Sequence, residues 1–585
     1  MTLYTHQTLF FPRYCYSIKM KKYFVTSALP YANGDIHIGH LVEYIQTDIW
    51  VRLKKLLGNE VVYVCADDAH GTPVMLKAES EKTTPEKLIA KMQKRHKEDF
   101  DSFYIEFDNY YTTHSQENED LSSTIFERLK KSDLIEKKII EQFFDEEKQM
   151  FLPDRYIVGT CPRCGALDQY GDSCEKCGAT YSPTDLGMPR SVLTGNTPIR
   201  KKTDHYFFKL SSKKCFSFLN EWTHGRDTLQ EEARNKIREW LKKDEEGYSL
   251  LADWDISRDA PYFGFKIPGT KNKYFYVWLD APIGYYASLI NWCSSQKKDV
   301  NEYIGKEAKV ELIHFIGKDI LYFHALFWPA MLHFSGFRTP TSLYAHGFLT
   351  INGKKMSKSR VTFITARAYL DKNIEAEFLR YYFASKLNGS MEDLDMNMSE
   401  FVQKVNGDLV GKFINIQSRC SGFLLRHFDG EILSQKEIVA INPIEARLEE
   451  KIEQASEQIK EAYNLRNTSR AVKEIMRLVD QINNYIQEKK PWETAKNIEN
   501  ISKTEILSLH SVLSLSLRCF GKISILLKPV IPITCNKIER DFFCCETPFL
   551  WQDISNLRIK KIRNIGHLIK RINEEDVVSL VKVNE

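Results

Sequence analysis

A strand, a loop, a helix and a second strand follow one another near the start of the chain, and this order constrains the fold most. Residues 22–28 form a short apolar segment, and the β-branched residues 60–65 run into Asp67 and Asp68. Between these segments, apolar residues recur at three- and four-residue steps over residues 39–57, which is typical of a helix with one buried face. We therefore predict a βαβ unit. Its first loop and its two acids lie at the carboxyl edge of a parallel sheet, where ligands gather.

Length, composition and charge exclude several classes of protein. The 585 residues include 82 basic and 78 acidic side chains, a formal net charge of +4, which argues against a polybasic protein but permits local basic faces. With 43% hydrophobic and 27% charged residues, the chain is typical of a globular protein of several domains. The richest apolar run, residues 325–332, is much shorter than the roughly 20 residues that span a bilayer. We expect no membrane association.

The amino terminus permits two interpretations. Its first 22 residues hold four basic residues and no acid, which is typical of a transit peptide. Met20 directly precedes Lys-Lys-Tyr-Phe-Val, however, so residues 1–19 alternatively extend a chain that starts at Met20, and we favour this extension. Thirteen cysteines without a secretory signal indicate reduced thiols. We expect a cytoplasmic protein.

Four of the cysteines form two closely spaced pairs. These are Cys161-Pro-Arg-Cys164 and Cys174-Glu-Lys-Cys177, each followed by glycine. Two such turns bring four thiolates together, and a tetrahedron of sulfurs satisfies Zn²⁺ without leaving a position for water. We predict one structural zinc ion.

The rest of the chain divides into an interruption, a return of strands and a helical region. Polar segments and the cysteine pairs interrupt the pattern from about residue 115 to 255, and apolar strands return at residues 273–279, 310–316 and 343–349. From about residue 400 no strand pattern is present, and apolar residues keep helical spacing up to Pro491. We predict an all-helical bundle there. Residues 558–571 hold six basic residues and no acid, which fits either a solvated helix face or a contact with a polyanion.

Two motifs carry the chemistry, although the chain has neither a Walker A sequence nor G-x-G-x-x-G. His37-Ile-Gly-His40 opens the first helix, where backbone N–H groups and the helix dipole favour an anion. Lys355-Met-Ser-Lys358-Ser follows a glycine, and its two ammonium groups can neutralise a departing pyrophosphate. Taken alone, the first motif also fits a helix cap and the second a solvated basic loop.

Together the two motifs resemble the signature pair of class I aminoacyl-tRNA synthetases. Five further blocks make the chain similar to the methionyl-tRNA synthetase family of the bacterial type, from about residue 23 to about residue 551. These blocks are Ala28-Leu-Pro-Tyr-Ala-Asn-Gly, Cys65-Ala-Asp-Asp-Ala-His-Gly-Thr72, Trp254-Asp-Ile-Ser-Arg-Asp-Ala-Pro-Tyr-Phe-Gly264, Tyr276-Val-Trp-Leu-Asp-Ala-Pro-Ile-Gly284 and Phe315-Ile-Gly-Lys-Asp319.

The resemblance implies an α/β fold in which a Rossmann-like parallel-sheet catalytic domain is split by a zinc-binding insertion and followed by an all-α anticodon-binding bundle. The domains expected are residues 1–19 (extension), 20–114 and 257–344 (catalytic halves), 115–256 (insertion), 345–400 (linking domain with the lysine loop), 401–560 (bundle) and 561–585 (tail).

The activity implied is that of a methionine–tRNA ligase, which uses ATP and Mg²⁺. Methionine is activated to methionyl-adenylate and then transferred to the terminal adenosine of initiator and elongator methionine tRNAs. The family's pattern places His37, His40, Lys355 and Lys358 in catalysis, and His37, Gly39, His40, Gly317, Asp319 and Lys358 at ATP. No extra carboxyl-terminal domain of the dimeric relatives follows the bundle, so a monomer is expected.

The family's pattern also supplies the residues expected to bind methionine and the anticodon. The methionine set is Leu29, Tyr31, Asp68, Arg258, Trp278, Ala281, Pro282, Tyr285, Ile320, Phe323, His324 and Trp328, with Asp68 at the ammonium rather than Asp67. Aromatic walls suit a soft sulfur, and the Tyr31 hydroxyl is expected to reach it. The anticodon readers implied are Asn415, Arg419, Pro491 and Trp492. Gly411 stands where the family usually has asparagine, which removes one expected hydrogen bond.

Two other functions remain open at this stage. One is a nucleotidyltransferase that adenylates a small acid without tRNA, and the helical carboxyl-terminal region argues against it. The other is a non-catalytic zinc protein that binds RNA, and the intact histidine and lysine motifs argue against that.

Overall fold

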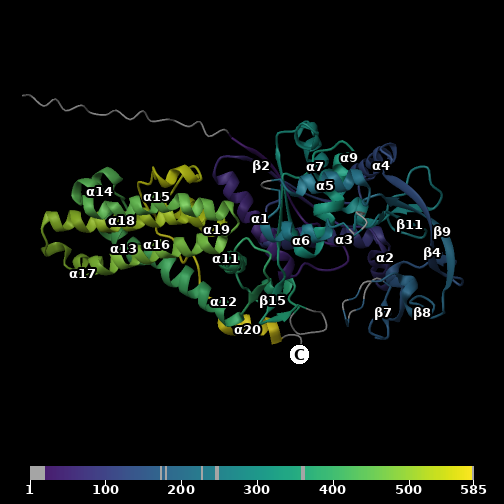
Figure 1. Ribbon diagram of the computed structural model, residues 1–585. Helices are drawn as coiled ribbons and strands as arrows, with labels where there is room; N and C mark the ends of the chain where they lie inside the picture. Colours follow the sequence, from purple (N-terminus) through teal and green to yellow (C-terminus); the bar gives the residue numbers. More distant parts are fainter. Residues whose placement is uncertain are drawn as a thin grey trace, which may run out of the picture.

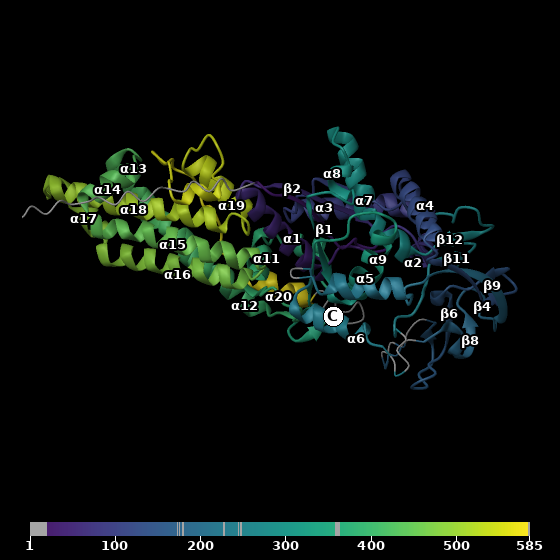
Figure 2. The ribbon, with the colours of Figure 1, turned by 45° about the horizontal axis from the view of Figure 1, so that its top comes forward.

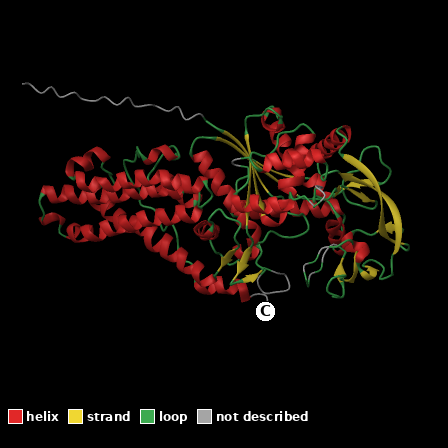
Figure 3. Ribbon diagram, viewed as in Figure 1, coloured by secondary structure: helices red, strands yellow, loops and turns green. Residues whose placement is uncertain are grey.

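The computed structural model describes residues 20–582 except 172, 173, 175, 178, 180, 226, 227, 244, 246–248 and 357–362, and only the backbone course of residues 355, 581 and 582. The expected extension, residues 1–19, lies outside the described residues, as does Lys358. A lobe of strands and helices lies beside an elongated bundle of helices (Figure 1, Figure 3).

A five-stranded parallel sheet forms the centre of the first lobe, in the order β14-β13-β1-β2-β3. The strands are β1 (Lys22–Ser27), β2 (Glu60–Asp67), β3 (Asn109–Thr112), β13 (Glu311–Gly317) and β14 (Ser342–His346). Because the chain runs outward from β1 in one direction and from β13 in the other, the strand order reverses between these two strands. Ligands bind at the carboxyl ends of strands at such a switch point.

Helices cover both faces of this sheet because the strand side chains alternate in direction. Val25 faces α1 (Ile38–Leu56) and the core that continues into the bundle, whereas Phe24 faces the core beneath α4 (Gln116–Lys131), α7 (Val277–Gln296) and α9 (Trp328–Phe334). The remaining helices of this lobe are α2 (Thr72–Ser80), α3 (Pro85–Ser102) and α8 (Asn301–Ile304). The predicted βαβ unit is therefore present as β1, α1 and β2.

Two of the predicted strands have different bounds in the structure. The expected strand at residues 273–279 is only β12 (Lys273–Phe275), because the chain turns into α7 at Val277. The expected strand at residues 343–349 divides between β14 and β15 (Leu349–Ile351), which belong to different sheets. Neither change of direction is signalled by a periodicity of its own, since both segments are mainly apolar and aromatic.

An insertion between β3 and β12 carries most of the remaining strands, at the far end of the lobe (Figure 2). A four-stranded sheet contains β4 (Ile135–Asp145), β5 (Met150–Phe151), β9 (Ile199–Phe208) and β10 (Trp254–Asp255). A smaller sheet holds β6 (Ile157–Thr160), β7 (Gln169–Tyr170) and β8 (Gly187–Ser191) around the cysteine pairs. Helices α5 (Lys213–Thr223) and α6 (Glu231–Trp240) and strand β11 (Ser257–Asp259) lead back to the central lobe.

The described part of the chain after Met398 contains only helices and irregular segments, as the helical spacing predicted. The connecting region comprises β15, β16 (Lys354–Lys355), β17 (Leu394–Met396), α10 (Ala366–Leu370) and α11 (Ala376–Lys386). The bundle comprises α12 (Met398–Lys404), a π-helical stretch (Val405–Ile414), α13 (Asn415–Phe428), α14 (Gln435–Ile441), α15 (Pro443–Asn464), α16 (Thr468–Lys489), α17 (Pro491–Lys496), α18 (Lys503–Leu527) and α19 (Pro532–Lys537). The chain then returns to α12 through α20 (Glu574–Lys582).

The basic segment at residues 558–571 is not a helix. It runs as an irregular segment that forms a β-bridge from Lys561 to Glu431, and its apolar residues Ile559 and Ile562 are buried against the bundle. The solvated helix face that we considered for this segment is therefore wrong.

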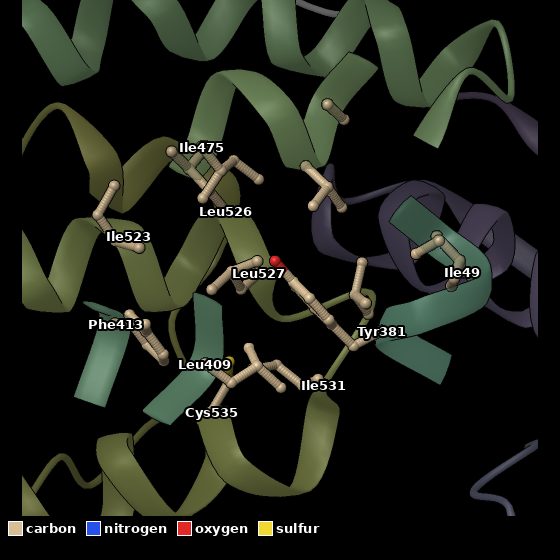
Figure 4. Packing of buried hydrophobic residues seen from close by; sticks show 14 of the residues in the cluster. Ile49, Tyr381, Leu409, Phe413, Ile475, Ile523, Leu526, Leu527, Ile531 and Cys535 are labelled. Carbon is tan, nitrogen blue, oxygen red and sulfur yellow. The ribbon is translucent and has the colours of Figure 1, made fainter. Parts of the chain in front are cut away.

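Helix α18 corrects the expectation that no apolar segment approaches membrane-spanning length. By length and composition alone it could cross a membrane, and 78% of its most apolar window is buried inside the protein. Its side chains Ile523, Leu526 and Leu527 pack in the bundle core, where Tyr381 of α11 lies between them and Ile49 of α1 (Figure 4). A central bundle helix is buried on most sides because other helices surround it, and the buried charges of α18, Arg518 and Lys522, pair with Glu449 of α15.

One buried arginine joins the bundle to the central lobe. Arg380 on α11 is fully buried, and it donates to Asp48 Oδ2 of α1 at 2.6 Å and to the Phe103 carbonyl at 3.2 Å. It also donates to the carbonyls of Pro529 and Val530, after α18, at 3.1 and 2.9 Å. A guanidinium offers five N–H donors in a planar fork, so one side chain satisfies groups from three segments.

Removing this guanidinium leaves the carbonyls of Phe103, Pro529 and Val530 without this donor, while Asp48 still pairs with Arg52. We expect Arg380→Met to lower the free energy of unfolding by about 3–5 kcal/mol, measured as a shift in the urea midpoint followed by circular dichroism. Arg540→Met is the matched control, because Arg540 is exposed and pairs only with Asp541. An equal, small effect of the two substitutions would contradict the role given to Arg380.

Candidate functional site

A cavity of about 600 Å³ opens at the carboxyl ends of β1 and β13, at the switch point of the sheet. All five described residues expected at ATP, His37, Gly39, His40, Gly317 and Asp319, line it. The loop after β1, the start of α1 and the turn after β13 therefore meet at one place.

His37 and His40 cap the first turn of α1 with each other's help. The His40 N–H donates to Nδ1 of His37 at 3.2 Å, and the His37 N–H donates to Nδ1 of His40 at 3.4 Å. Their rings stack with centroids 3.5 Å apart. Each backbone N–H group donates to an unprotonated Nδ1 of the other residue's ring. The first N–H groups of a helix have no partner inside the helix, and these two bonds supply one.

The capping bonds also fix the tautomer of His40. Burial lowers the pKa of His40 well below its usual value, and the nearby His37 and His96 lower it further. Because Nδ1 accepts, a neutral ring carries its proton on Nε2. His40 is thus a neutral N–H donor at the positive end of a helix, which suits an anionic ligand.

The lysine loop is anchored beside the histidines at both of its described ends. Met356 and Phe363 flank the undescribed residues 357–362, and both line the same cavity. A Cβ atom on Gly39 would lie 3.1 Å from the end of the Met356 side chain, so a larger residue would have to displace that side chain slightly. The Phe363 ring packs edge-on against His37 at 5.1 Å.

Glu43 and His346 also line this cavity, and neither was predicted from the sequence. Glu43 accepts from the Ala28 N–H at 2.5 Å and lies 3.0 Å from Nε2 of His346. Burial raises the pKa of Glu43. Glu43 lies one helical turn after His40, and this spacing indicates that the two side chains face the same way. His346 belongs to a strand that is distant in sequence, so no local spacing indicates it.

A second cavity, of about 80 Å³, adjoins the first. It is lined by ten of the twelve residues expected at methionine: Leu29, Asp68, Trp278, Ala281, Pro282, Tyr285, Ile320, Phe323, His324 and Trp328. Leu29 and Ile320 line both cavities. The rings of Trp278 and Phe323 stack at 3.6 Å between centroids, which gives the cavity an aromatic wall.

The two neighbouring acids have different surroundings. Asp68 is in the second cavity, and its Oδ1 has no hydrogen-bond partner among the described residues. Burial raises the pKa of Asp68 well above its usual value, and the charge of Asp280 adds to the shift. Asp67 instead contacts the Tyr110 hydroxyl and lies 2.8 Å from Nδ1 of His96. A cation in the cavity would therefore find its partner in Asp68.

The polar groups at the apolar wall satisfy one another. Nδ1–H of His324 donates to the Ile320 carbonyl at 3.0 Å, and Nε2 accepts from the Tyr285 hydroxyl at 2.8 Å. Burial lowers the pKa of His324 to about 4, so the ring is neutral. A neutral and internally paired wall favours an apolar side chain over a charged one.

Tyr31 and Arg258 lie outside the lining of the second cavity. The Tyr31 hydroxyl donates to the His70 carbonyl at 2.5 Å. Tyr31 lines the first cavity instead. The Arg258 guanidinium stacks over the ring of Tyr276, the residue that precedes α7, with its carbon 3.6 Å from the ring centroid.

The expected anticodon readers gather at the end of the bundle where α13, α16 and α17 meet. Arg419 lies 4.7 Å from the Trp492 ring centroid and donates to Gln487 at 2.7 Å. Asn415 donates to Asn483 at 3.3 Å. Gln487 and Asn483 were not singled out from the sequence, although they lie four residues apart on one face of α16. Pro491 is buried as the first residue of α17, and Gly411 is exposed in the π-helical stretch.

The four clustered cysteines converge in the insertion. All four Sγ atoms lie within 4.8 Å of one another. Cys164 Sγ is 3.5 Å from Cys174 Sγ, and Cys161 Sγ is 3.9 Å from Cys177 Sγ. Tetrahedral Zn²⁺ with bonds of about 2.3 Å separates its sulfur ligands by about 3.8 Å, so the set fits zinc. Backbone N–H groups of Arg163 and Cys177 contact Sγ of Cys161 and Cys174, as suits thiolates.

Known proteins resemble the chain over most of its length. A family model described as tRNA synthetases class I (M) matches residues 23–421, and one described as an anticodon-binding domain of tRNA ligase matches residues 445–579. The methionine–tRNA ligases of Cupriavidus necator and Cupriavidus metallidurans are 52% and 53% identical over 566 residues, 96% of this chain and 80% of each relative. Mycobacterium tuberculosis methionyl-tRNA synthetase in complex with methionyl-adenylate shares the fold, with a TM-score of 0.74, 21% identity, and coverage of 94% of this chain and 99% of that one.

The cysteine cluster predicts one zinc ion per chain. We expect Cys174→Ser to lose most of the metal, measured by native mass spectrometry, and to lower the melting temperature, because a structural zinc contributes folding energy. Cys544→Ser, at a free thiol outside the cluster, should keep the full metal content. Wild-type protein that carries no zinc after expression in zinc-supplied cells would contradict the assignment.

Proposed function

The chain belongs to the class I tRNA synthetases of the methionine type, and we propose that it joins L-methionine to methionine tRNAs at the expense of ATP. The products are AMP, diphosphate and methionyl-tRNA. The observation that carries this proposal is the adjacency of the two cavities, which share Leu29 and Ile320. A methionine held by its side chain and ammonium in the second cavity presents its carboxylate to a nucleotide in the first.

Activation is an in-line displacement at phosphorus. A methionine carboxylate oxygen attacks the α-phosphorus of ATP while the bond to the bridging oxygen of diphosphate breaks. Such a reaction needs alignment and stabilisation of spreading negative charge more than covalent help. The Nε2–H of His40 is a neutral donor for the phosphates. His37, at the same helix start, contacts them as well. Lys355 and Lys358 hold the departing diphosphate.

Asp68 supplies the charge partner for the substrate. Its buried, unpartnered oxygen gains a cation when the methionine ammonium binds. Gly317 and Asp319 line the nucleotide cavity after β13, where a ribose would lie. Mg²⁺ accompanies ATP in this proposal and neutralises part of its charge.

Transfer completes the reaction at the same place. A ribose hydroxyl of the terminal tRNA adenosine attacks the methionyl carbonyl, and AMP leaves. The bundle selects the tRNA, for initiation and elongation alike, by stacking anticodon bases on Trp492 beside Arg419, Asn415 and Pro491. Because residue 411 is glycine and not asparagine, the bundle has one side chain fewer that can hydrogen-bond to an anticodon base.

The proposal includes the organisation and compartment expected from the sequence. The catalytic halves are residues 20–114 and 257–344, the insertion is 115–256, the linking domain is 345–400, and the bundle is 401–560. None of the twelve cysteines in the described part of the chain forms a disulfide, which supports a cytoplasmic protein. We include a monomeric state in the proposal.

The lysine loop gives the sharpest test of activation. We expect methionine, alone among the standard amino acids, to support ATP–pyrophosphate exchange. Lys358→Ala should lower kcat about 10²-fold. The methionine Kd from calorimetry should stay unchanged, because the Lys358 side chain is proposed to contact the diphosphate and not methionine. The control Lys354→Ala should retain activity, since that exposed lysine precedes the motif. Exchange driven by leucine would contradict the proposal.

The anticodon end gives an independent test. Trp492→Ala removes one stacking surface, so we expect the KM for methionine tRNA to rise about tenfold in aminoacylation assays. Methionine-dependent exchange should be unchanged, because Trp492 is in the bundle and outside both cavities. Trp292→Ala, at a partly buried tryptophan of α7, controls for loss of an indole. An unchanged KM for tRNA would contradict the assignment.

A further inference from the structure

His205 lies at the junction between the insertion and the methionine-binding wall. It projects from β9, and its ring is fully buried between the carboxylates of Asp255 and Asp259. We infer that His205 is a positioning residue for methionine recognition, a buried imidazolium that fixes the two acids on either side of Arg258. The inference rests on the proposed function, in which Arg258 serves the methionine site.

Arg258 depends on Asp255 for its orientation. The Arg258 guanidinium donates to Asp255 Oδ2 at 3.2 Å and to the Ser257 carbonyl at 2.7 Å, and it stacks on the Tyr276 ring. Tyr276 comes two residues before Trp278 of the second cavity. A shift of Asp255 would therefore move the arginine and the Tyr276 ring, which precedes the cavity residue Trp278 by two positions.

His205 holds both acids through its two ring nitrogens. Nδ1 lies 2.7 Å from Asp255 Oδ2, the same oxygen that accepts from Arg258, and Nε2 lies 3.0 Å from Asp259 Oδ2. Asp259 Oδ1 accepts from Lys273 at 2.5 Å, and Thr203 also donates to Asp259. Both hydrogen bonds of the ring are thus with carboxylates on the strands next to Arg258.

Two carboxylate partners require two donors on the ring. A neutral imidazole has one N–H, so its other nitrogen would place a lone pair against a carboxylate oxygen. An imidazolium donates to both. Burial alone would lower the pKa of His205, but the hydrogen bonds to Asp255 and Asp259 raise it above its usual value.

The other charged groups around the ring are occupied. Lys273 opposes the imidazolium charge but pairs with Asp259, and Lys138, the neighbour of His205 on β4, has its ammonium 2.7 Å from Asp253. Arg258 and Lys273 each pair with one of the two carboxylates, and the His205 ring shares both of them.

The two ring nitrogens of His205 are tested separately by substituting asparagine or glutamine, whose side-chain amides extend to different lengths. Asparagine at position 205 places its N–H near the position of Nδ1 and keeps the bond to Asp255, whereas glutamine reaches the position of Nε2 and keeps the bond to Asp259. We expect His205→Gln to raise the KM for methionine about tenfold and His205→Asn to raise it much less. The kcat for exchange and the KM for ATP should stay within about twofold in both.

A control and a pH series separate positioning from a purely structural role. His224→Gln, at an exposed histidine of the same insertion, should leave the methionine KM unchanged. The imidazolium is present below the folded-state pKa of His205 and is lost as pH rises through it. The ratio of methionine KM in His205→Gln to that in wild type should therefore fall with rising pH, while Asp68 and the substrate ammonium titrate in both proteins.

Equal methionine KM values in the two variants, or a ratio independent of pH, would overturn the inference. Parallel losses in kcat, ATP KM and melting temperature would also overturn it, because they indicate only structural support. Failure of the proposed function is recognised separately, by wild-type protein without methionine-dependent exchange.

Discussion

Backbone pairing between the segment before α1 and the segment after the lysine loop determines where the chemistry of this chain can occur. The Ile38 N–H donates to the Ile364 carbonyl at 3.0 Å, and the Ala366 N–H donates to the Ile36 carbonyl at 2.8 Å. His37 and Thr365 form a bridge between these bonds. Regions more than three hundred residues apart are thereby joined at the start of α1. Met356 and Phe363, the described residues on either side of residues 357–362, both line the nucleotide cavity.

Helix α1 connects this site to the rest of the molecule. Its first turn carries the paired histidines, its middle carries Asp48, and Asp48 contacts the buried Arg380 that also holds the end of α18. The bundle core continues without interruption from Ile49 of α1 to α18 (Figure 4). The end that is proposed to read the anticodon and the helix that is proposed to bind phosphate therefore belong to one packed body. We propose no signal between them, because the structure shows a single arrangement.

Local patterns in the sequence predicted the parts of the fold that depend on local physics. The βαβ unit followed from apolar spacing, the cysteine cluster from two short turns, and the helical bundle from long amphipathic segments. The start of α7 at Val277 and the division of residues 343–349 between two sheets were missed, because tertiary contacts decide between strand and helix in short, mainly apolar segments. Partners such as His346 and His205 are distant in sequence from the residues they hold, so no spacing could indicate them. The site residues themselves came from family resemblance, since each alone is equally plausible as core.

The central claim is that the histidine pair and the lysine loop act on the same triphosphate, and a double-mutant cycle tests it most directly. His40→Asn retains a side-chain acceptor for the His37 N–H but removes the Nε2–H donor, and Lys358→Ala removes the ammonium. Single-turnover rates of adenylate formation would be measured for wild type, both single variants and the double variant. Groups that share one transition state should show a coupling energy of about 1 kcal/mol or more. Effects that add to within about 0.5 kcal/mol would contradict the account.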